Sequence, residues 1–318
     1  MTPAEPLFIL AAPRSTSSVS CAMLGQHPQM YGLPETHLFR FDTMAPWFEH
    51  DRQHSFQIHG LLRVVAEVYY GGQTARTVAA ARGWLRRRAN VTSGAVLEEI
   101  ATTLAPRILV DKSPSTVYAP DRLGRTRTFF PAARYIHLVR HPRPYCTSVL
   151  TYLDTLSRPD HRTPGAADGA GEAPEWIDHL ASFPYGDLPP RDPQGGWYAL
   201  NTLIVDFLAA VPDARWTTVR AEDLVGDPAA VSARLAGWLG LRTDEAAVSR
   251  MLHPELSPYA RFGPPGAREG NDIFFLERPA LRSPRPQTHV LEGPLPWRAD
   301  GAGFLPEVCD LARRFGYE

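Results

Sequence analysis

Residues 7–24 read LFILAAPRSTSSVSCAML. The continuous apolar run at residues 8–12 is typical of a strand that is buried on both faces of a parallel sheet. A short turn rich in hydroxyl groups follows, and apolar residues at helical spacing come next, at Val19, Met23 and Leu24. This stretch therefore predicts a strand, a tight loop and a helix, which is the opening of an α/β fold.

The loop of this stretch has the features of an anion site. Where a strand passes into a helix, free backbone N–H groups and the positive end of the helix dipole attract negative charge. A guanidinium and four hydroxyl groups add donors, from Arg14, Ser15, Thr16, Ser17 and Ser18. The G-x-x-x-x-G-K-[ST] pattern is absent, which weakens a nucleoside triphosphate interpretation. Taken alone, a serine-rich helix cap explains these residues equally well.

Apolar bursts and helical patterns alternate along the rest of the chain. Further strands are predicted at residues 108–110, 135–139 and 216–219, and helices within 41–104 and at 197–210, 228–239 and 305–315. The first two of these strands end in charged residues, as strands do when functional groups lie at their carboxyl ends. We therefore predict an α/β fold of three layers, with a central, mainly parallel sheet flanked by helices.

Domain organisation follows from the 318 residues and their distribution. No internal repeat or clear boundary divides the chain, which predicts a single domain over 1–318. Residues 157–196 are crowded with Pro, Gly, Asp and Arg, which indicates a lid or an insertion on the acceptor side. Residues 257–296 form a second Pro/Gly-rich stretch before the final helix.

Composition and charge exclude several classes of protein. Hydrophobic residues make up 44% and charged residues 21%, as in ordinary globular proteins. The formal net charge is −1, so no global field draws in nucleic acid or anionic lipid. The apolar run at 7–12 is too short for a signal segment, and three cysteines without a paired motif suit a reducing compartment. We expect a cytoplasmic protein with neither a nucleic-acid nor a membrane partner; its oligomeric state is not encoded in these patterns.

A second motif lies at residues 135–142, YIHLVRHP, where a strand again ends in a basic residue. Ser148 follows Arg140 by eight positions. If a helix starts near Pro142, Arg140 and Ser148 can grip one phosphate group from two sides. For Arg140 alone, a surface ion pair is the simpler explanation.

The two motifs together, in this order and at this spacing, resemble the sulfotransferases that use 3′-phosphoadenosine 5′-phosphosulfate (PAPS). That family has a P-R-S-G-[ST]-[ST] loop for the 5′ phosphate, and an Arg followed eight residues later by a Ser for the 3′ phosphate. Further matches bring the resemblance to residues 7 to about 241: Gln26-His27-Pro28, EDLVGDP at 222–228 and WLGL at 238–241.

This resemblance implies a P-loop NTPase-like sulfotransferase fold, with PAPS as co-substrate and PAP as product. The residues expected to bind the cofactor are Arg14, Ser15, Thr16, Ser17, Ser18, Arg140 and Ser148. Thr16 stands where the family's loop has Gly, so we expect the backbone to avoid positive φ there or the loop to be wider. The family's late cationic element is not recognisable, and Arg261, Arg268 and Arg278 are its candidate substitutes.

The catalytic candidates lie in two further motifs. Residues 32–37, GLPETH, resemble the E-T-[RH] element of tyrosylprotein sulfotransferases, and residues 33–41 resemble the P-E-x-H-L segment of sulfotransferase domains in polyketide assembly lines. Both families place an acidic residue beside the acceptor here. Residues 110–114, VDKSP, resemble a strand-end K-x-P element whose lysine faces the sulfuryl group, and Lys112 is the only lysine in the chain.

The expected roles follow from sulfuryl transfer, which needs in-line positioning, cations on the transferred group and a base for the acceptor. Lys112 and Arg14 would neutralise charge around the sulfuryl group and the 5′ phosphate. Glu35 would take the acceptor proton, and His37 would orient Glu35, contact the acceptor or act as the base itself. No metal is expected from the two H-x-x-x-H pairs. His137 and His141 lie on either side of a predicted strand end, and His50 and His54 lack the glutamate of H-E-x-x-H and a nearby cysteine.

The sequence thus predicts sulfuryl transfer from PAPS to a hydroxyl of a small-molecule or carrier-protein-tethered secondary metabolite, giving a sulfate ester and PAP. A nucleotide or small-molecule kinase on a related fold is one alternative, opposed by the missing Gly-Lys-[ST] and Mg²⁺-binding pattern. A non-catalytic member that binds PAP or a carrier protein is another. It stays open because Thr16 and Ala221 depart from the family's pattern. Alcohol, phenol and amine acceptors all remain open.

Overall fold

Five parallel strands form the centre of the molecule. The computed structural model describes residues 4–53, 55–156, 192–281 and 289–318. The strands are β1 (Leu7–Leu10), β2 (Met30–Gly32), β3 (Ile108–Asp111), β4 (Arg134–Val139) and β5 (Trp216–Arg220). They lie in the order β2-β3-β1-β4-β5, and every neighbouring pair is parallel. The predicted α/β fold with a parallel central sheet is confirmed.

Alternate residues of β1 face two separate hydrophobic cores. Leu7 and Ile9 pack into one core, and Phe8 and Leu10 into the other. The first core is closed by α1 (Ser17–Gly25), α10 (Ala221–Gly226), α11 (Pro228–Trp238) and α12 (Glu245–Met251). Because helices cover both faces of the sheet, the central strand β1 is buried and apolar throughout rather than alternating.

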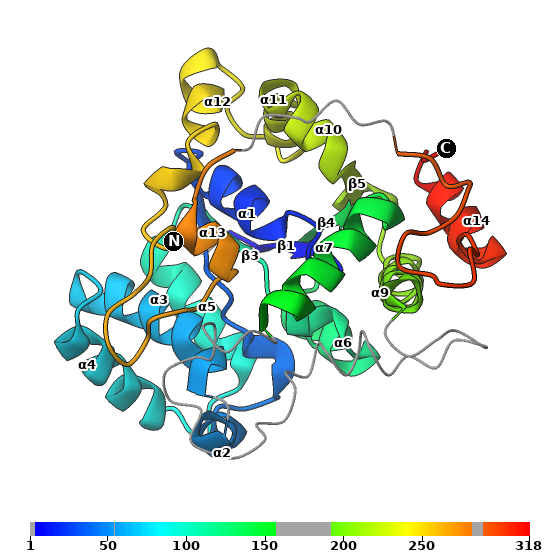
Figure 1. Ribbon diagram of the computed structural model, residues 1–318. Coiled ribbons are helices and arrows are strands. Elements are labelled where there is room, and N and C mark those ends of the chain that lie inside the picture. The colour runs from blue at the N-terminus through cyan, green and yellow to red at the C-terminus, as the bar shows by residue number, and fades with distance from the viewer. Residues whose placement is uncertain (1–3, 54, 157–191, 282–288) are drawn as a thin grey trace.

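The second core lies under a larger set of helices. These are α2 (Ala45–Gln53), α3 (His59–Tyr70), α4 (Ala75–Arg86), α5 (Ser93–Leu104), α6 (Pro120–Phe129), α7 (Pro142–Leu156), α9 (Pro193–Leu208) and α14 (Pro306–Arg314). Helices α3 and α4 pack together at the lower left of Figure 1, α10 to α12 lie at the top, and α14 lies beside α9. The short helix α13 (Ile273–Glu277) packs on α1 through Phe275 and Ala22.

Short 3-10 turns connect several of these elements. They are η1 (Leu38–Arg40), η2 (Ser55–Ile58), η3 (Pro114–Val117), η5 (Asp213–Arg215) and η6 (Pro254–Leu256). Two of them, η1 and η3, follow the ends of β2 and β3 and pack against each other. They therefore form part of the wall at the carboxyl edge of the sheet.

Asp-Pro pairs start two of the helices that flank the sheet. The Asp192 side chain accepts from Gln194 N–H before α9, and Asp227 accepts from Ala230 N–H before α11. Such a cap satisfies a free helical N–H, and Pro fits the first helical turn, where no N–H is needed.

The insertion expected at 157–196 extends too far toward the C-terminus, because residues 193–196 already belong to α9. Its remainder, 157–191, lies outside the described residues.

The edge strand β2 is an element that the sequence pattern does not predict. It has only three residues, which is too short for a period-2 pattern to emerge. It pairs with β3 in parallel and packs against α1. A Cβ on Gly25 would lie 2.4 Å from the Gly32 backbone nitrogen. The two glycines therefore permit the close packing of α1 on β2.

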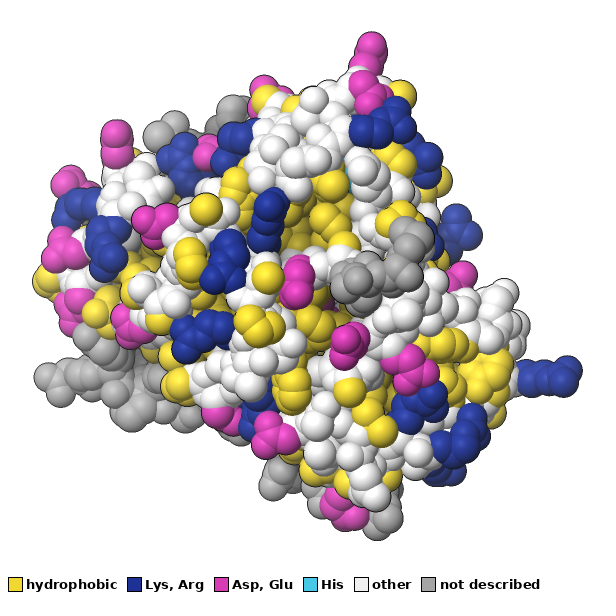
Figure 2. Space-filling view, turned by 180° about the vertical axis from the view of Figure 1, so that it is seen from behind, with side chains coloured by type: hydrophobic (Ala, Val, Ile, Leu, Met, Phe, Trp, Pro, Cys, Tyr) yellow, Lys and Arg dark blue, Asp and Glu magenta, His cyan; other side chains and the backbone are white. Residues whose placement is uncertain are grey.

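The molecular surface agrees with the near-zero net charge. On the face seen in Figure 2, acidic and basic side chains are interspersed over the surface rather than gathered in a field of one sign. Within the described ranges, the helices are all too short or too polar to cross a membrane.

Candidate active site

The carboxyl ends of three adjacent strands bring the predicted motifs together. Strand β1 lies between β3 and β4, so the loop after β1 has Lys112 on one side and Arg140 on the other. Ligands of open α/β sheets bind at such strand ends. Lys112 contacts Ser18 of α1, and Arg140 contacts Arg14 of the loop. The structure therefore joins motifs through contacts that span 94 and 126 residues of sequence.

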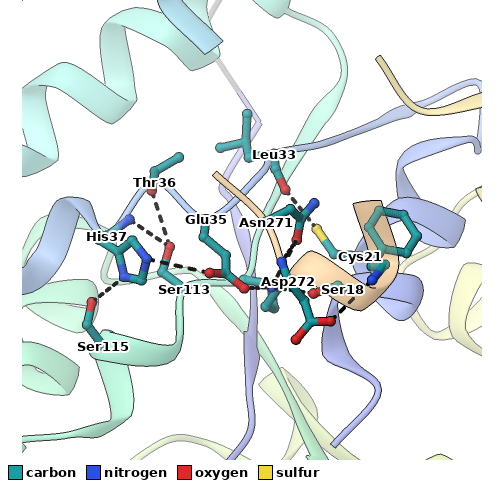
Figure 3. A network of polar contacts seen from close by, with 12 residues as sticks. Ser18, Cys21, Leu33, Glu35, Thr36, His37, Ser113, Ser115, Asn271 and Asp272 are labelled. Atoms are coloured by element: carbon teal, nitrogen blue, oxygen red, sulfur yellow. Dashed lines mark hydrogen bonds and ion pairs between the residues drawn. The ribbon is translucent and has the colours of Figure 1, made fainter. Parts of the chain in front are cut away.

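Lys112 is a buried cation whose three protons all have acceptors. Its residue is 2% exposed, and its Nζ forms an ion pair with Glu35. Nζ also donates to Ser18 Oγ at 2.8 Å and to Asn271 Oδ1 at 3.3 Å. Figure 3 shows these two acceptors together with Glu35. An ammonium has three donors and no acceptor, so this arrangement satisfies it fully. Lys112 thus links the start of α1, the segment after β2 that carries Glu35, and the segment before α13 that carries Asn271.

Glu35 is held ionised by its neighbours. Burial by itself would raise the pKa of this carboxyl, but the Lys112 ammonium and the His37 imidazole outweigh burial and lower the pKa to about 2. The backbone N–H of Glu35 also donates to the carbonyl of Gly270 at 2.8 Å. Glu35 therefore enters any reaction as a carboxylate that is already aligned with the lysine.

A glycine on α3 permits this position of Glu35. A Cβ on Gly60 would lie 2.0 Å from the carbonyl oxygen of Glu35 and 3.2 Å from that of Gly270. Any side chain at this point would displace one of the two backbones. Gly60 therefore allows three segments that are distant in sequence to meet at the site.

His37 lies against Glu35 in an unusual backbone conformation. Its φ is 51°, in the left-handed region that non-glycine residues seldom occupy. Its Nε2 lies 3.6 Å from Glu35 Oε2, and its Nδ1 lies 2.8 Å from Ser115 Oγ. Both side chains keep some contact with the exterior, at 13% exposed for His37 and 17% for Glu35. The two candidate bases therefore form one pair at an accessible edge.

The loop before α1 adopts the conformation that was expected to be avoided. Thr16 has φ 67°, the same value as Arg14, so of the two expectations for this position, the avoidance of positive φ is wrong. Ser20 donates to the Thr16 carbonyl from both its N–H, at 3.1 Å, and its Oγ, at 3.0 Å. These bonds offset a backbone cost of about 1–2 kcal/mol per left-handed residue. The buried serines Ser15, Ser17 and Ser18 lie in this turn.

Arg14 lies beside the residues predicted to bind the 3′ phosphate. Its Nε donates to Ser148 Oγ at 3.3 Å, and its guanidinium forms an ion pair with Asp272. Two aromatic rings flank the guanidinium, Tyr152 at 4.9 Å and Phe274 at 5.0 Å. Arg140 Nη1 donates to the Arg14 carbonyl at 2.8 Å. The structure thus gathers Arg14, Arg140 and Ser148 into one basic cluster, apart from Lys112.

The backbone of Arg140 is anchored by a buried network. The Trp197 indole N–H donates to the Arg140 carbonyl at 2.8 Å, and Asn201 bonds both the Trp197 carbonyl and His137 Nε2. Burial lowers the pKa of His137 to about 4, although its bond to Asn201 acts in the opposite direction. His137 therefore remains a neutral core residue. Among the described residues, no group of three or more His, Cys, Asp or Glu side chains is placed to hold a metal ion.

A late segment contributes site residues that the sequence motifs do not identify. Asn271 contacts Lys112, and Asp272 contacts Arg14 and caps α13 by accepting from the N–H groups of Phe274 and Phe275. An Asp before the apolar run IFFL is a helix-start signature, and it is the one sequence signal that points to this segment. Of the late arginine candidates, Arg268 lies over the Phe262 ring, 5.1 Å from its centroid.

Comparison with known proteins now identifies the family. The model of the "Sulfotransferase family" matches residues 6–245, so this chain belongs to the sulfotransferase family, as its motifs predict. Among curated proteins, none matches the chain.

Two solved structures share the fold over almost the whole chain. The sulfotransferase domain of the Synechococcus PCC 7002 olefin synthase has a TM-score of 0.72 and 23% identity, and covers 100% of this chain and 96% of its own. The sulfotransferase domain from the curacin biosynthetic pathway has a TM-score of 0.68 and 22% identity, with coverages of 99% and 98%. By family and fold, the chain is a sulfotransferase.

Proposed function

We propose that this sulfotransferase moves a sulfuryl group from PAPS to a hydroxyl of a small-molecule or carrier-protein-tethered secondary metabolite. The observation that carries the proposal is the buried Lys112–Glu35 ion pair at the end of β3, beside the loop of β1. A cation for the sulfuryl group and a carboxylate for the acceptor proton are thereby adjacent. The likeness to sulfotransferase domains of the curacin pathway and of an olefin synthase supports a metabolite acceptor.

In this proposal the basic cluster and the loop bind the two ends of the donor. Arg140 and Ser148 hold the 3′ phosphate, which distinguishes PAPS from ATP. The N–H groups at the start of α1, together with Ser15, Ser17 and Ser18, receive the 5′ phosphate. Arg14 leaves Asp272 and turns to the phosphate groups, because a phosphate offers it more negative charge than one carboxylate.

Lys112 then couples donor binding to the strength of the base. The sulfuryl oxygens compete with Glu35 for the Lys112 ammonium, so the pKa of Glu35 rises from its low value in the free protein. Glu35 accepts the acceptor's hydroxyl proton while the acceptor oxygen attacks sulfur in line. The bond between sulfur and the bridging phosphate oxygen breaks, and PAP leaves with that electron pair. His37 keeps Glu35 oriented throughout this step.

The donor assignment is tested by titrating the protein with PAP and with ADP in a calorimeter. We expect tight PAP binding and weak ADP binding, and a loss of PAP affinity of about 1.5–3 kcal/mol in Arg140→Ala. Arg242→Ala is the control, because that guanidinium pairs with Asp244 on the exterior. Equal affinity for ADP with Arg140 irrelevant, or a preference for ATP with Mg²⁺, would reject PAPS in favour of a kinase-like donor.

Asp272 is expected to compete with the donor for Arg14. Asp272→Ser removes the carboxylate but keeps a side chain that can cap α13, so PAP should bind about two- to fivefold more tightly, the range of a partly exposed ion pair. The same titration measures this. Asp227→Ser, which alters the cap of α11 away from the site, should leave PAP affinity unchanged. Weaker PAP binding in Asp272→Ser would instead make Asp272 a support for the donor.

The acceptor class is tested by release of PAP from PAPS with three probes. These are S-(3-hydroxybutanoyl)pantetheine, a free aliphatic alcohol and tyrosine, which represent tethered, free and phenolic hydroxyls. We expect the pantetheine thioester to give the highest kcat/KM. A cytoplasmic location and a single domain over 1–318 stay predictions of the same proposal.

A further inference from the structure

Asp111 is a buried carboxylate with no part in the chemistry described so far. It lies at the end of β3, directly before Lys112, and is 2% exposed. Its Oδ1 accepts from Thr36 Oγ1 at 2.8 Å and from Ser113 Oγ at 3.3 Å. Both hydroxyls belong to the wall of the candidate active site, next to His37 (Figure 3). Burial of a carboxylate costs free energy of folding, so a buried charge in this position indicates a role for Asp111.

Each of the two hydroxyls also accepts a backbone N–H. The His37 N–H donates to Ser113 Oγ at 2.9 Å, and the Leu38 N–H points to Thr36 Oγ1 at 3.5 Å. An ionised carboxylate can only accept, so it favours both hydroxyl protons pointing toward Asp111 over a bond across the 3.4 Å contact between Thr36 Oγ1 and Ser113 Oγ. The lone pairs of the two oxygens are then free to accept from the backbone. A neutral carboxyl can itself donate a proton to one of the hydroxyl oxygens. The two hydroxyl protons then no longer have to point toward Asp111.

These bonds hold the backbone of His37, which is in a strained left-handed conformation. His37 has φ 51°, and its own N–H is bound by Ser113. Left-handed conformations of non-glycine residues persist only where the surroundings over-determine them. The conformation directs the imidazole so that Nε2 faces Glu35 and Nδ1 faces Ser115 (Figure 3). If the turn relaxed, His37 would lose its alignment with the carboxylate.

We propose that Asp111 is a positioning residue for sulfuryl transfer. Through the hydroxyls of Ser113 and Thr36 it holds the backbone at residues 36–38, the His37 turn, against Glu35. The inference rests on the proposed function, because that function gives the Glu35–His37 pair its role. It adds a residue that touches neither the donor nor the acceptor, and it gives the Asp of the D-K-S-P motif a task distinct from that of Lys112.

The charge of Asp111 is costly to the folded protein. Burial raises the pKa of Asp111 to about 6, although the bonds from Thr36 and Ser113 and the charges of His37 and Lys112 lower it. Among the described residues, Cys21 of α1 also interacts with Asp111, and its thiol stays neutral because burial raises its pKa to about 12.

The raised pKa sets how stability depends on pH. An acid whose folded pKa lies above its ordinary value of 3.8 binds its proton more tightly in the folded state. The free energy of unfolding therefore falls as pH rises from about 4 to about 6, and stays lower above this range. A charge that costs stability at neutral pH points to a functional role rather than a structural one.

The test is Asp111→Asn, which keeps the shape and an acceptor oxygen but removes the charge. At pH 8 we expect a Tm no lower than that of the unaltered protein and a PAP affinity within about twofold. With PAPS and S-(3-hydroxybutanoyl)pantetheine, kcat should fall about tenfold or more while KM changes little. Asp206→Asn, an exposed change on α9, is the matched control and should alter none of these quantities.

A spectroscopic readout makes the test independent of the acceptor. In protein labelled with ¹³C-histidine, the Cε1–H resonance of His37 is assigned by its absence in His37→Gln. Asp111→Asn should shift this resonance, because the turn that aligns the imidazole with Glu35 and Ser115 loses its support. The resonance of His137, held in the core by Asn201, should stay in place.

Two outcomes would overturn the proposal. An unchanged kcat together with an unmoved His37 resonance means that Asp111 does not position the turn. A lower Tm with loss of both PAP binding and turnover means that Asp111 serves the fold alone. If Asp111→Asn does not fold, Ser113→Ala removes one of the two connections and must give the same shift of the His37 resonance. Where both single variants fold, the double variant should lose little more than either single one, because they act on the same turn.

Failure of the proposed function has a different signature. If the unaltered protein neither binds PAP nor releases it from PAPS, the donor assignment fails. The His37 resonance in Asp111→Asn then still decides whether Asp111 holds the turn.

Discussion

Lys112→Met is expected to lower kcat for sulfuryl transfer on the order of 10³-fold, with little change in PAP affinity. Methionine keeps the length and apolar stem of lysine but removes the cation that would face the sulfuryl oxygens. PAP lacks the sulfuryl group, so its binding should not report this loss. Steady-state release of PAP from PAPS, combined with calorimetric titration of PAP, separates the two effects.

The structure also gives this variant a second, measurable effect. Glu35, Ser18 and Asn271 lose their shared donor, and Glu35 becomes a buried carboxylate without its main partner. Only His37 then opposes the effect of burial, so the pKa of Glu35 rises from its low value. Lys112→Met should therefore be destabilised, and the double variant with Glu35→Gln should recover stability but not rate. Equal loss of PAP affinity and kcat in Lys112→Met would place Lys112 on a phosphate group instead.

Glu35→Gln is expected to lower kcat by roughly 10²- to 10⁴-fold, the usual contribution of a general base. Glutamine still accepts a hydrogen bond from Lys112 and fits the space beside Gly60, so the fold should persist. PAP affinity should remain near that of the unaltered protein. Glu98→Gln, an exposed change on α5, is the matched control. If His37→Gln abolished turnover while Glu35→Gln kept most of it, His37 would be the base.

The same variant has a defined effect on acid stability. The pKa of Glu35 is lowered to about 2 by Lys112 and His37, against an ordinary value near 4.5. The stability that the carboxylate contributes is therefore complete above about pH 4.5 and is lost as pH falls toward 2. Urea unfolding over this range should show a smaller loss for Glu35→Gln than for the unaltered protein. Equal losses would mean that Lys112 does not stabilise the ionised carboxylate.

Much of the fold was predictable because it is encoded by near neighbours. The apolar run at 8–12 and the loop after it are read from adjacent residues, and the resulting strand, turn and helix are β1, the loop and α1. The same holds for the strand ends at Lys112 and Arg140, where a buried run stops at a charge. Parallel strands then have to bring these ends to one edge, which is why a set of loose motifs predicts one site.

Other features depend on contacts between distant segments. The backbone at Thr16 takes positive φ in a packed turn where residue type alone argued against it, and β2 packs on α1 at a distance that only Gly25 and Gly32 permit. Asn271 reaches Lys112 across 159 positions, and Asp272 reaches Arg14 across 258. No local pattern encodes such pairs, since loop residues carry no periodicity and their side chains are placed by the packing of α13 on α1.

Residue types and their spacing were thus sufficient for the family, the parallel sheet and the edge of the sheet at which the motifs meet. Packing alone decided the partners of each charge: Lys112 with Glu35, Arg14 with Asp272, and Asp111 with the hydroxyls behind His37. The physical reason is that propensity and hydrophobic pattern act over a few residues. The pKa of a buried charged group and the orientation of its side chain depend instead on burial, neighbouring charges and hydrogen bonds from segments that are distant in sequence.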